Sequence, residues 1–231
     1  MCGRYTLDVS AETLAKAFDL APIGFRVERH WNIAPGQHVI VIRPDRGRRI
    51  ADQARWGLVP AWSKKPNAGP RPINARAETV ATRPTFRDAF RHGRCLVPAS
   101  GFYEWKAEGG RKQPMVIHPK GGGLLAFAGL RATWEGPEGP LHTVCILTTT
   151  PNELMAPIHD RMPVILDPKN WEAWLEPGTP HQDLEALLVP CPASSLLAHA
   201  VGSAVGNVRN DDPGLVRPVQ PRAPEGPPAQ A

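Results

Sequence analysis

The fold is decided by residues 94–149, which read RCLVPASGFYEWKAEGGRKQPMVIHPKGGGLLAFAGLRATWEGPEGPLHTVCILTT. Five short runs in this stretch are rich in β-branched, aromatic and other apolar residues, and turns rich in glycine and proline separate several of them. This alternation is typical of successive short β-strands. We therefore predict strands at residues 94–98, 101–105, 115–118, 124–130 and 143–149.

Weaker signals on both sides of this stretch complete the expected elements. Further strands are predicted at residues 2–7, 38–43 and 50–58, and residues 59–73, which contain four prolines, are predicted to form a loop. Short helices are predicted after Ser10 as N-cap, between Pro84 and Gly93, and near residues 151–158, 168–175 and 181–188.

Together these elements predict one α+β domain. Its core is expected to be a strongly bent mixed or antiparallel sheet, or a barrel, with short helices at the periphery. A chain of 231 residues is long enough for one such core. The domain is predicted to cover residues 1–216, and residues 217–231, with five prolines, are predicted to be a flexible tail.

The charge distribution gives a first hint of a partner. The net charge is +5, yet residues 43–94 alone carry thirteen Lys and Arg against four Asp and Glu. Concentrated positive charge is typical of a face that binds phosphates. Folding could equally scatter these arginines over several faces, and the composition does not decide between the two interpretations.

Several classes of protein lack support in this sequence. The four cysteines are far apart, so no zinc ribbon or thioredoxin-like motif is present, and neither a metal nor a cofactor is expected. There is no glycine-rich phosphate loop, HExxH or GxSxG motif. With no signal peptide, a longest apolar stretch of only residues 121–130 and no coiled-coil pattern, we expect a cytoplasmic, monomeric protein that makes no membrane contact.

Cys2 is the first candidate for chemistry. Removal of Met1 would leave an α-amine and a β-thiol on one residue. Their ordinary pKa values, about 8 and about 8.5, leave part of each deprotonated at neutral pH. The amine can condense with an aldehyde to an imine, on which the thiol closes to a five-membered thiazolidine. The alternative is a cysteine buried as a small apolar residue.

Three further motifs could carry chemistry. Asn74, Arg76 and Glu78 would share one face of an extended segment, where Arg76 could bind a phosphate in a bidentate manner. Glu104 lies among aromatic residues, and burial would raise its pKa and suit it to proton transfer. His159 is a possible acid or base beside Arg161. Each has a plainer alternative: a polar strand face, a surface glutamate or a structural histidine in a turn.

Taken together, these motifs resemble one family. MCGRY at residues 1–5, NIAPGQ at 32–37, WGLVPAW at 56–62, INARAET at 73–79, SGFYEW at 100–105 and HDRMPVIL at 159–166 occur in the order typical of the SOS response-associated peptidase (SRAP) family. Residues 207–212 also look similar to that family. The resemblance implies an α+β fold around a barrel-like sheet.

The resemblance also implies a function. SRAP proteins sense abasic sites in single-stranded DNA and cross-link to them through the N-terminal cysteine. The resemblance implies that Cys2 is the nucleophile, that Asn74 positions the Cys2 amine or the sugar, and that Glu104 and His159 transfer protons. It further implies that Arg76 and Arg161, with help from Arg4, hold the phosphates that flank the abasic site. Asn32, Pro35 and the loop from Trp56 to Trp62 would shape the groove around the strand, and Thr148 is a further expected DNA contact.

Two other functions stay open at this point. The chain could be a cysteine peptidase with Cys2 as nucleophile and His159 as base, acting either on peptides in general or only to remove its own Met1 or release its own cross-link. It could instead bind nucleic acid without catalysis, with Cys2 incidental. If the chain captures abasic sites, its predicted partner is single-stranded DNA that contains an abasic site.

Overall fold

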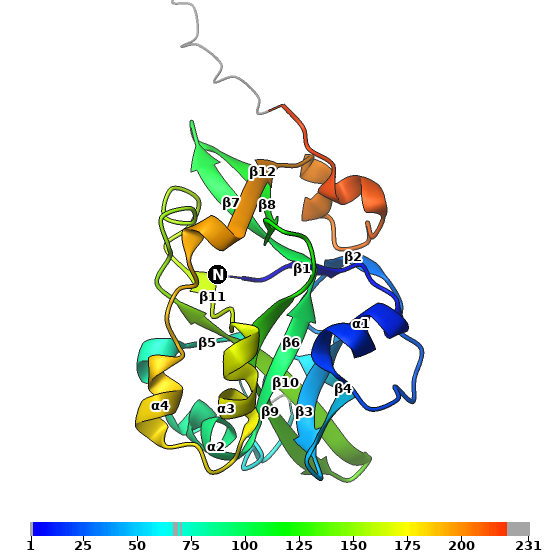
Figure 1. Ribbon diagram of the computed structural model, residues 1–231, viewed down its shortest axis with the longest axis vertical. Helices are drawn as coiled ribbons and strands as arrows, with labels where there is room; N and C mark the ends of the chain where they lie inside the picture. Colours follow the sequence, from blue (N-terminus) through cyan, green and yellow to red (C-terminus); the bar gives the residue numbers. More distant parts are fainter. Residues whose placement is uncertain (1, 67–68, 70, 221–231) are drawn as a thin grey trace, which may run out of the picture.

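Five strands close into a small mixed barrel at the centre of the molecule (Figure 1). The computed structural model describes residues 2–66, 69 and 71–220. The barrel consists of β3 (His38–Asp45), β4 (Arg48–Trp56), β6 (Arg94–Ala99), β9 (Leu125–Gly136) and β10 (Gly139–Thr149). Neighbours run antiparallel in the order β4-β3-β6-β9-β10, and β10 closes the ring by pairing with β4 in parallel. The predicted α+β fold with a barrel-like core is confirmed.

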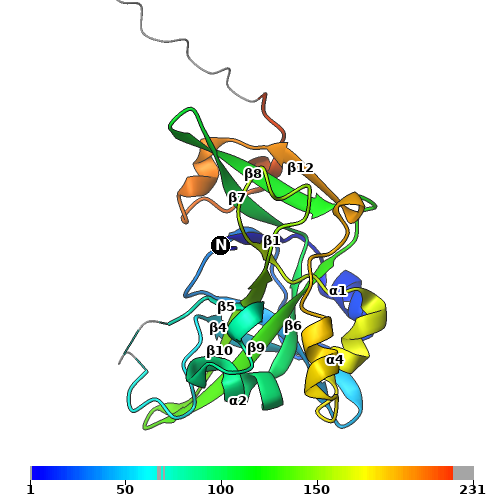
Figure 2. The same ribbon diagram turned by 90° about the vertical axis from the view of Figure 1, so that its left-hand side faces the viewer.

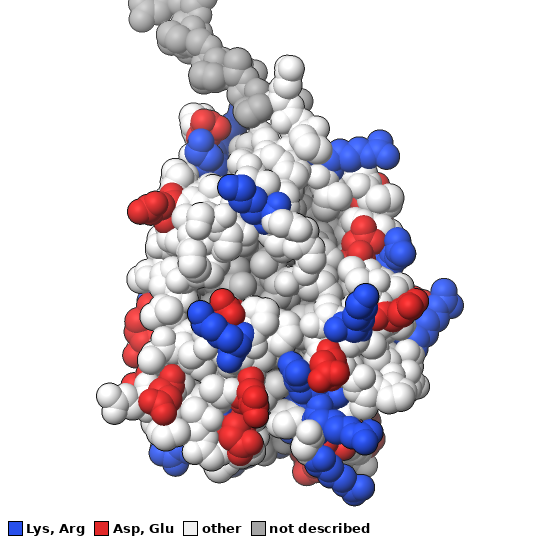
Figure 3. Space-filling view, viewed as in Figure 1, with Lys and Arg blue, Asp and Glu red and all other residues white. Residues whose placement is uncertain are grey.

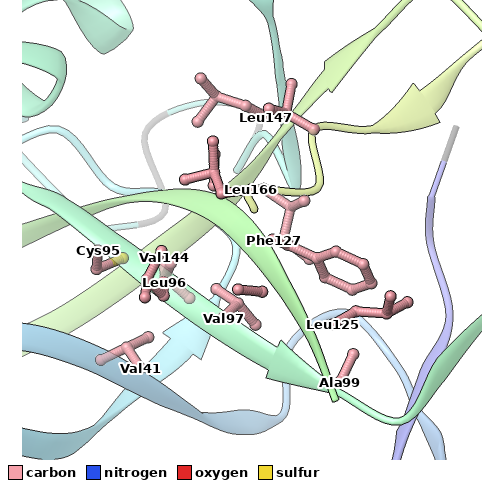
Figure 4. Close-up of a cluster of buried hydrophobic side chains, with 14 of the residues drawn as sticks. Val41, Cys95, Leu96, Val97, Ala99, Leu125, Phe127, Val144, Leu147 and Leu166 are labelled. Atoms are coloured by element: carbon pink, nitrogen blue, oxygen red, sulfur yellow. The ribbon is translucent and has the colours of Figure 1, made fainter. Parts of the chain in front are cut away.

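The barrel interior is the hydrophobic core (Figure 4). Val97, Phe127 and Val144 from three different strands are fully buried there. Gly129 belongs to the same interior, where a Cβ would come within 2.9 Å of the Cys95 sulfur. A side chain at residue 129 would therefore push the neighbouring strand outward. Burial of each large apolar side chain in this interior, such as Phe127, contributes about 1.5–3 kcal/mol to the free energy of unfolding.

A second, five-stranded sheet lies against one end of the barrel, with β1 on the side next to it (Figure 2). Its order is β12 (Leu196–Ala200), β8 (Arg111–Pro119), β7 (Gly101–Glu108), β1 (Tyr5–Leu7) and β2 (His30–Ile33). The chain passes from β6 of the barrel directly into β7 at Ser100. Gly101 is required at this bend because a Cβ would lie 2.8 Å from the Ile117 carbonyl oxygen. The two sheets therefore meet at a seam.

The α-helices and two minor strands lie around the barrel, and the 3₁₀ helices after residue 202 pack on the second sheet (Figure 1). The α-helices are α1 (Ala11–Phe18), α2 (Pro84–His92), α3 (Trp171–Leu175) and α4 (His181–Ala186). The 3₁₀ helices are η1 (Ala77–Thr79), η2 (Pro168–Asn170), η3 (Ala193–Ser195), η4 (Ser203–Gly206) and η5 (Pro213–Val216). Two minor strands, β5 (Asn74–Arg76) and β11 (Met162–Pro163), pair with β10.

Local sequence signals placed several elements correctly. Ser10 is the N-cap of α1, and its hydroxyl accepts a hydrogen bond from the Thr13 N–H. Helix α2 begins at Pro84 and ends before Gly93, as predicted. The strands predicted within residues 94–149 all form, and four of them are extended beyond their predicted ends by at least two residues. At the amino end, β1 begins only at Tyr5 rather than at Cys2.

One predicted helix, at residues 151–158, is wrong. This segment forms irregular turns. Only single turns form, with the Ala156 N–H donating to the Asn152 carbonyl and the His159 N–H to the Met155 carbonyl. The Asn152 side chain caps the first turn and is held by the Cys191 carbonyl, and Pro157 has no N–H to continue the helix. The predicted tail at residues 217–231 lies outside the described residues from position 221 onward.

Candidate active site at the seam between the sheets

Cys2 lies in the interior and has no exposed surface. It precedes β1, whose Tyr5 packs edge-on against Trp56 and Phe127 of the barrel. Burial raises the pKa of the Cys2 thiol, and the nearby Glu104 carboxylate raises it further. The thiol is therefore neutral at physiological pH in this state. Both interpretations of Cys2 fit this burial: a reactive residue enclosed in a site, and a cysteine buried as a small apolar residue.

Glu104 and His159, the two residues predicted to transfer protons, lie close together in the site. Glu104 projects from β7 with only 2% of its surface exposed. Burial raises the pKa of Glu104, and the nearby His159 works in the opposite direction. His159 Nε2 lies 3.9 Å from Glu104 Oε2. The prediction of a buried carboxylate with a raised pKa is confirmed, and the alternative of a surface glutamate is wrong.

The His159 ring has two competing neighbours at Nδ1. The Arg161 backbone N–H donates to this nitrogen at 3.0 Å, which requires a lone pair there. Asp160 Oδ1 lies 2.8 Å from the same nitrogen and can only accept, which requires a proton there. The neutral ring with its proton on Nε2 accepts from the Arg161 amide, whereas a ring with a proton on Nδ1, neutral or charged, donates to Asp160. His159 thus has a backbone or carboxylate partner in each protonation state, as a proton-transfer group needs.

Asn74 lies at the start of β5, at the edge of the barrel. The β5–β10 ladder places Asn74 opposite Ile146 and Arg76 opposite Thr148. Asn74 Nδ2 donates to the Ile146 carbonyl at 3.4 Å, whereas Oδ1 is buried and has no hydrogen-bond partner within the part of the chain that the structure describes. A buried acceptor of this kind costs about 1–3 kcal/mol unless a donor reaches it. A ligand or an amine would supply that donor.

The extended face predicted for Asn74, Arg76 and Glu78 is only partly formed. Strand β5 ends at Arg76, and Glu78 belongs to the 3₁₀ helix η1. Arg76 is exposed and available to a ligand, whereas Thr148 is buried at 1% exposure. A DNA contact by the Thr148 side chain would therefore require movement of its neighbours.

Arg161 is engaged inside the protein. Its Nη1 and Nη2 donate to the two carboxylate oxygens of Glu78, and Nη2 also donates to the Thr148 carbonyl at 2.6 Å. The Arg161 side chain is only 11% exposed. A phosphate contact by Arg161 stays a prediction, because its strongest donors already have partners in this structure.

Asn32 is likewise an internal residue. It is 1% exposed, and its Nδ2 lies within hydrogen-bond distance of the Val205, Asn207 and Asn210 carbonyls. Its Oδ1 accepts from Arg4 Nη1 at 2.8 Å. Asn32 was predicted to shape the DNA groove directly. The structure gives it another task, since it ties the segment at residues 205–210 to the strand that follows Cys2.

Arg4 shares this network. Its Nη1 also donates to the Val205 carbonyl at 2.8 Å, and its guanidinium lies 5.7 Å from the centre of the Trp105 ring. Burial lowers the pKa of Arg4, although the group remains cationic. Arg4 thus anchors the chain two residues after Cys2. A phosphate contact by its remaining donors stays a prediction.

Pro35 and Trp62 lie on the surface, as groove residues should. Trp62 is 61% exposed and borders a pocket of about 280 Å³ beside α2. Its partner in the motif, Trp56, is buried and donates from Nε1 to the Ile73 carbonyl at 2.9 Å. In Figure 3 the face shown is hollowed near its middle, and Lys, Arg, Asp and Glu side chains surround the hollow.

The arginine-rich segment at residues 43–94 does not form one patch. Arg43 pairs with Asp52, and Arg49 lies near Asp19. Arg94 is 5% exposed and donates to the Trp174 and Phe90 carbonyls. Positive and negative side chains alternate on the face in Figure 3. Arg43, Arg49 and Arg94 are therefore distributed over different parts of the fold, as the second interpretation of the charge distribution predicts.

Among the described residues, no three His, Cys, Asp or Glu side chains are arranged to bind a metal ion. None of the helices in the described ranges has the length and apolar character needed to cross a membrane.

Sequence comparison places this site in a known family. The family model described as SOS response associated peptidase (SRAP) matches residues 1–208. The chain belongs to the SRAP family. Among its relatives, a protein of Bacillus subtilis (strain 168) named Abasic site processing protein YoqW is 42% identical over 221 residues, covering 94% of this chain and 99% of the relative.

More distant SRAP proteins carry the same kind of name. Abasic site processing protein YedK of Escherichia coli (strain K12) is 31% identical and covers 95% of this chain. Abasic site processing protein HMCES of Gallus gallus is 35% identical over 76% of this chain and 60% of its own length. A crystal structure of a protein from Bacteroides thetaiotaomicron, 25% identical, covers 95% of this chain and all of its own, with a TM-score of 0.86.

The structure adds one SRAP site residue that the sequence interpretation did not single out for a role of its own. Glu78 was grouped with Asn74 and Arg76 as part of a polar face, yet it is the bidentate partner of Arg161. The signal available in the sequence was its charge, opposite to that of Arg161. That signal could not identify the pair, because many acidic residues compete for each arginine.

Proposed function

We propose that this chain captures abasic sites in single-stranded DNA by a covalent thiazolidine bond to Cys2 after removal of Met1. The general function, processing of abasic sites in DNA, is supported by family membership and by relatives that are named for it and are 31–42% identical. An abasic deoxyribose opens to an aldehyde, which is the electrophile that an aminothiol requires. The more specific proposal, a thiazolidine cross-link to Cys2, rests on the chemistry of the site.

The reaction balances with the groups of the site alone. The Cys2 amine adds to the aldehyde carbon, and loss of one water gives an imine. The thiol sulfur then bonds to the imine carbon while its proton ends on the former amine nitrogen, which closes the ring. Both steps need proton transfer, to the leaving hydroxyl and then from sulfur to nitrogen. Glu104 and His159, with Nε2 3.9 Å from Oε2, are suited to transfer these protons.

One observation carries the proposal: the buried Cys2 thiol lies within the electrostatic reach of a buried carboxyl group with a raised pKa. A cysteine peptidase needs the opposite arrangement, in which the thiol pKa is lowered so that a thiolate attacks the carbonyl. Burial raises the pKa of Cys2 instead. Capture places a smaller demand on the thiolate, because attack on the imine of the same residue is intramolecular and the nearby Glu104 can take the thiol proton as the sulfur bonds to carbon. We therefore propose capture rather than general peptidase activity.

Asn74 is proposed to orient the reacting amine or the sugar. Its Oδ1 is a buried acceptor that no described group satisfies, and an α-amine or a sugar hydroxyl is the kind of donor it lacks. The Ile146 carbonyl holds the Asn74 amide on the other side. A fixed acceptor beside the nucleophile gains rate through orientation.

The bound strand is proposed to run over the exposed residues of the site. Arg76 is available for a phosphate, and Pro35 and Trp62 offer apolar surface for bases. Arg4, Asn32, Thr148 and Arg161 are proposed to support this groove from within, through the internal contacts described above. Single-stranded substrate fits because stacking surfaces need unpaired bases.

The test is incubation of the protein with a single-stranded oligonucleotide that carries one abasic site, followed by a denaturing gel. The expected result is a band of protein joined to DNA that survives heat and is absent with an intact strand. If no such band forms and a generic peptide is hydrolysed efficiently, the peptidase function replaces capture. If neither product forms but salt-sensitive binding remains, the chain is a binding protein and Cys2 is incidental.

A further inference from the structure

The Glu78–Arg161 pair is the feature of the site that the proposed chemistry does not use. Arg161 Nη1 lies 2.5 Å from Glu78 Oε1, and Nη2 lies 2.9 Å from Oε2. A guanidinium that meets both oxygens of a carboxylate is among the stronger and more directional ion pairs in proteins. The hydrogen bond from Arg161 is the main reason that the pKa of Glu78 is lowered, so the carboxylate stays ionised at neutral pH.

The same guanidinium joins two parts of the fold. Glu78 belongs to η1, directly after β5, and Thr148 lies near the end of β10. Arg161 Nη2 donates to the Thr148 carbonyl at 2.6 Å while it holds Glu78. Since β5 pairs with β10 at Arg76 and Thr148, the pair fastens Arg161 to the edge of the barrel where Asn74 also lies.

This attachment lies two residues from His159. Residues 150–161 contain no helix or strand, so regular secondary structure does not hold the His159 ring. The Arg161 backbone N–H donates to His159 Nδ1 at 3.0 Å and turns Nε2 toward Glu104. Arg161 and its neighbour Asp160, whose Oδ1 lies 2.8 Å from the same nitrogen, therefore set the direction of the ring, and both move with the turn that Arg161 fixes.

We infer that Glu78 is a positioning residue that aims His159 at Glu104 by fixing Arg161. The inference deepens the proposed function and rests on it, because the reaction to be measured is capture of an abasic site. Glu78 touches neither the nucleophile nor the acid–base pair in this arrangement. It acts through one intermediate, Arg161, whose side chain it holds and whose backbone holds the ring.

The expected effect follows from the precision that proton transfer requires. Without the Glu78 carboxylate, Arg161 keeps its hydrogen bond to the Thr148 carbonyl but loses both hydrogen bonds of the ion pair. The turn that carries His159 then becomes more mobile. A displacement of about 1 Å in a reacting group can cost on the order of 100-fold in rate. Glu78→Gln retains the size and one acceptor, so we expect a smaller loss, about tenfold in the rate of adduct formation.

The experiment is a double-mutant cycle on the rate of cross-linking to single-stranded DNA with one abasic site. Wild type, Glu78→Gln, His159→Gln and the double variant are compared at equal fractions of bound DNA. If Glu78 works through His159, Glu78→Gln slows the wild type about tenfold but slows the His159→Gln variant little or not at all. Asp52→Asn is the matched control, since it removes a carboxylate bonded to Arg43 on β3 at 2.9 Å, away from the seam. It should leave the rate unchanged.

Each other result overturns the inference. Equal slowing in both backgrounds means that Glu78 acts independently of His159, as a general stabiliser would. An unchanged rate means that Arg161 does not depend on Glu78, and a faster rate with tighter DNA binding means that Glu78 competes with a phosphate for Arg161. If wild type itself forms no adduct while it folds and binds DNA, the proposed function fails rather than this inference.

Discussion

His159 Nε2 lies 3.9 Å from Glu104 Oε2, although one residue belongs to irregular turns after β10 and the other to β7 of the second sheet. The seam between the sheets is where these two segments meet, and β1, which follows Cys2, enters the same seam. This arrangement brings Cys2, Glu104 and His159 together from three distant parts of the chain. Its consequences can be tested one residue at a time.

Separation of the amine from the thiol should abolish capture. An alanine inserted between Met1 and Cys2 keeps the thiol but moves the α-amine to another residue, so no five-membered ring can close. We expect no stable adduct from this variant or from Cys2→Ala on a denaturing gel, and weak binding to intact single strands should persist. Cys191→Ala, at a partly exposed cysteine, is the control and should cross-link as wild type does. An intact adduct from the insertion variant would rule out the aminothiol mechanism.

The raised pKa of Glu104 should appear as a pH dependence of stability. Because burial makes the folded protein hold this proton more tightly than the unfolded chain does, its contribution to stability is fully present below the ordinary carboxyl pKa. That contribution is lost as the pH rises through the raised folded-state pKa. Glu104→Gln cannot ionise, so wild type should lose Tm relative to the variant across this window. Thermal unfolding at a series of pH values measures it, and parallel curves would contradict it.

Arg76 should contribute one phosphate contact. It is exposed at the end of β5, and the internal ion pairs described above do not involve it. Arg76→Ala is expected to weaken capture and to lower the slope of log affinity against log salt by about 0.7, the value for one contact with a single strand. Fluorescence anisotropy with intact oligonucleotides over a salt series gives the slope. Arg87→Ala, at an exposed arginine of α2, should leave it unchanged, and an unchanged slope for Arg76→Ala would remove this residue from the groove.

Asn32 should contribute to stability rather than to base contacts. Asn32→Ala leaves the buried Arg4 donor and the carbonyls of residues 205, 207 and 210 without their partner, which should cost about 2–4 kcal/mol. Urea unfolding measures this loss. Asn207→Ala removes only an exposed bond to the Arg209 N–H and should cost about 0.5 kcal/mol or less. Equal stability of the two variants would mean that Asn32 has no anchoring role.

Local patterns predicted the strands of the barrel because each needs only its own alternation of apolar residues and turns. They failed at residues 151–158, where apolar residues at helical spacing lie between two prolines and Asn152 caps a turn instead. The extended segment that they predicted through Glu78 is also too long, since Glu78 belongs to η1 and bonds to Arg161. In both places a side-chain contact to a distant segment outweighed the local preference.

The sequence by itself determined most of the elements and singled out Cys2, Glu104 and His159 as candidates, because these depend on residue type and short spacing. Only the tertiary structure decided which charged groups meet. Asn32 and Arg161, predicted to contact DNA, bond inside the protein, and closure of β10 against β4 and β9 sets the seam where Glu104 and His159 approach. Pairings of this kind are settled by long-range packing, since each buried polar group must find whichever partner the fold brings within reach.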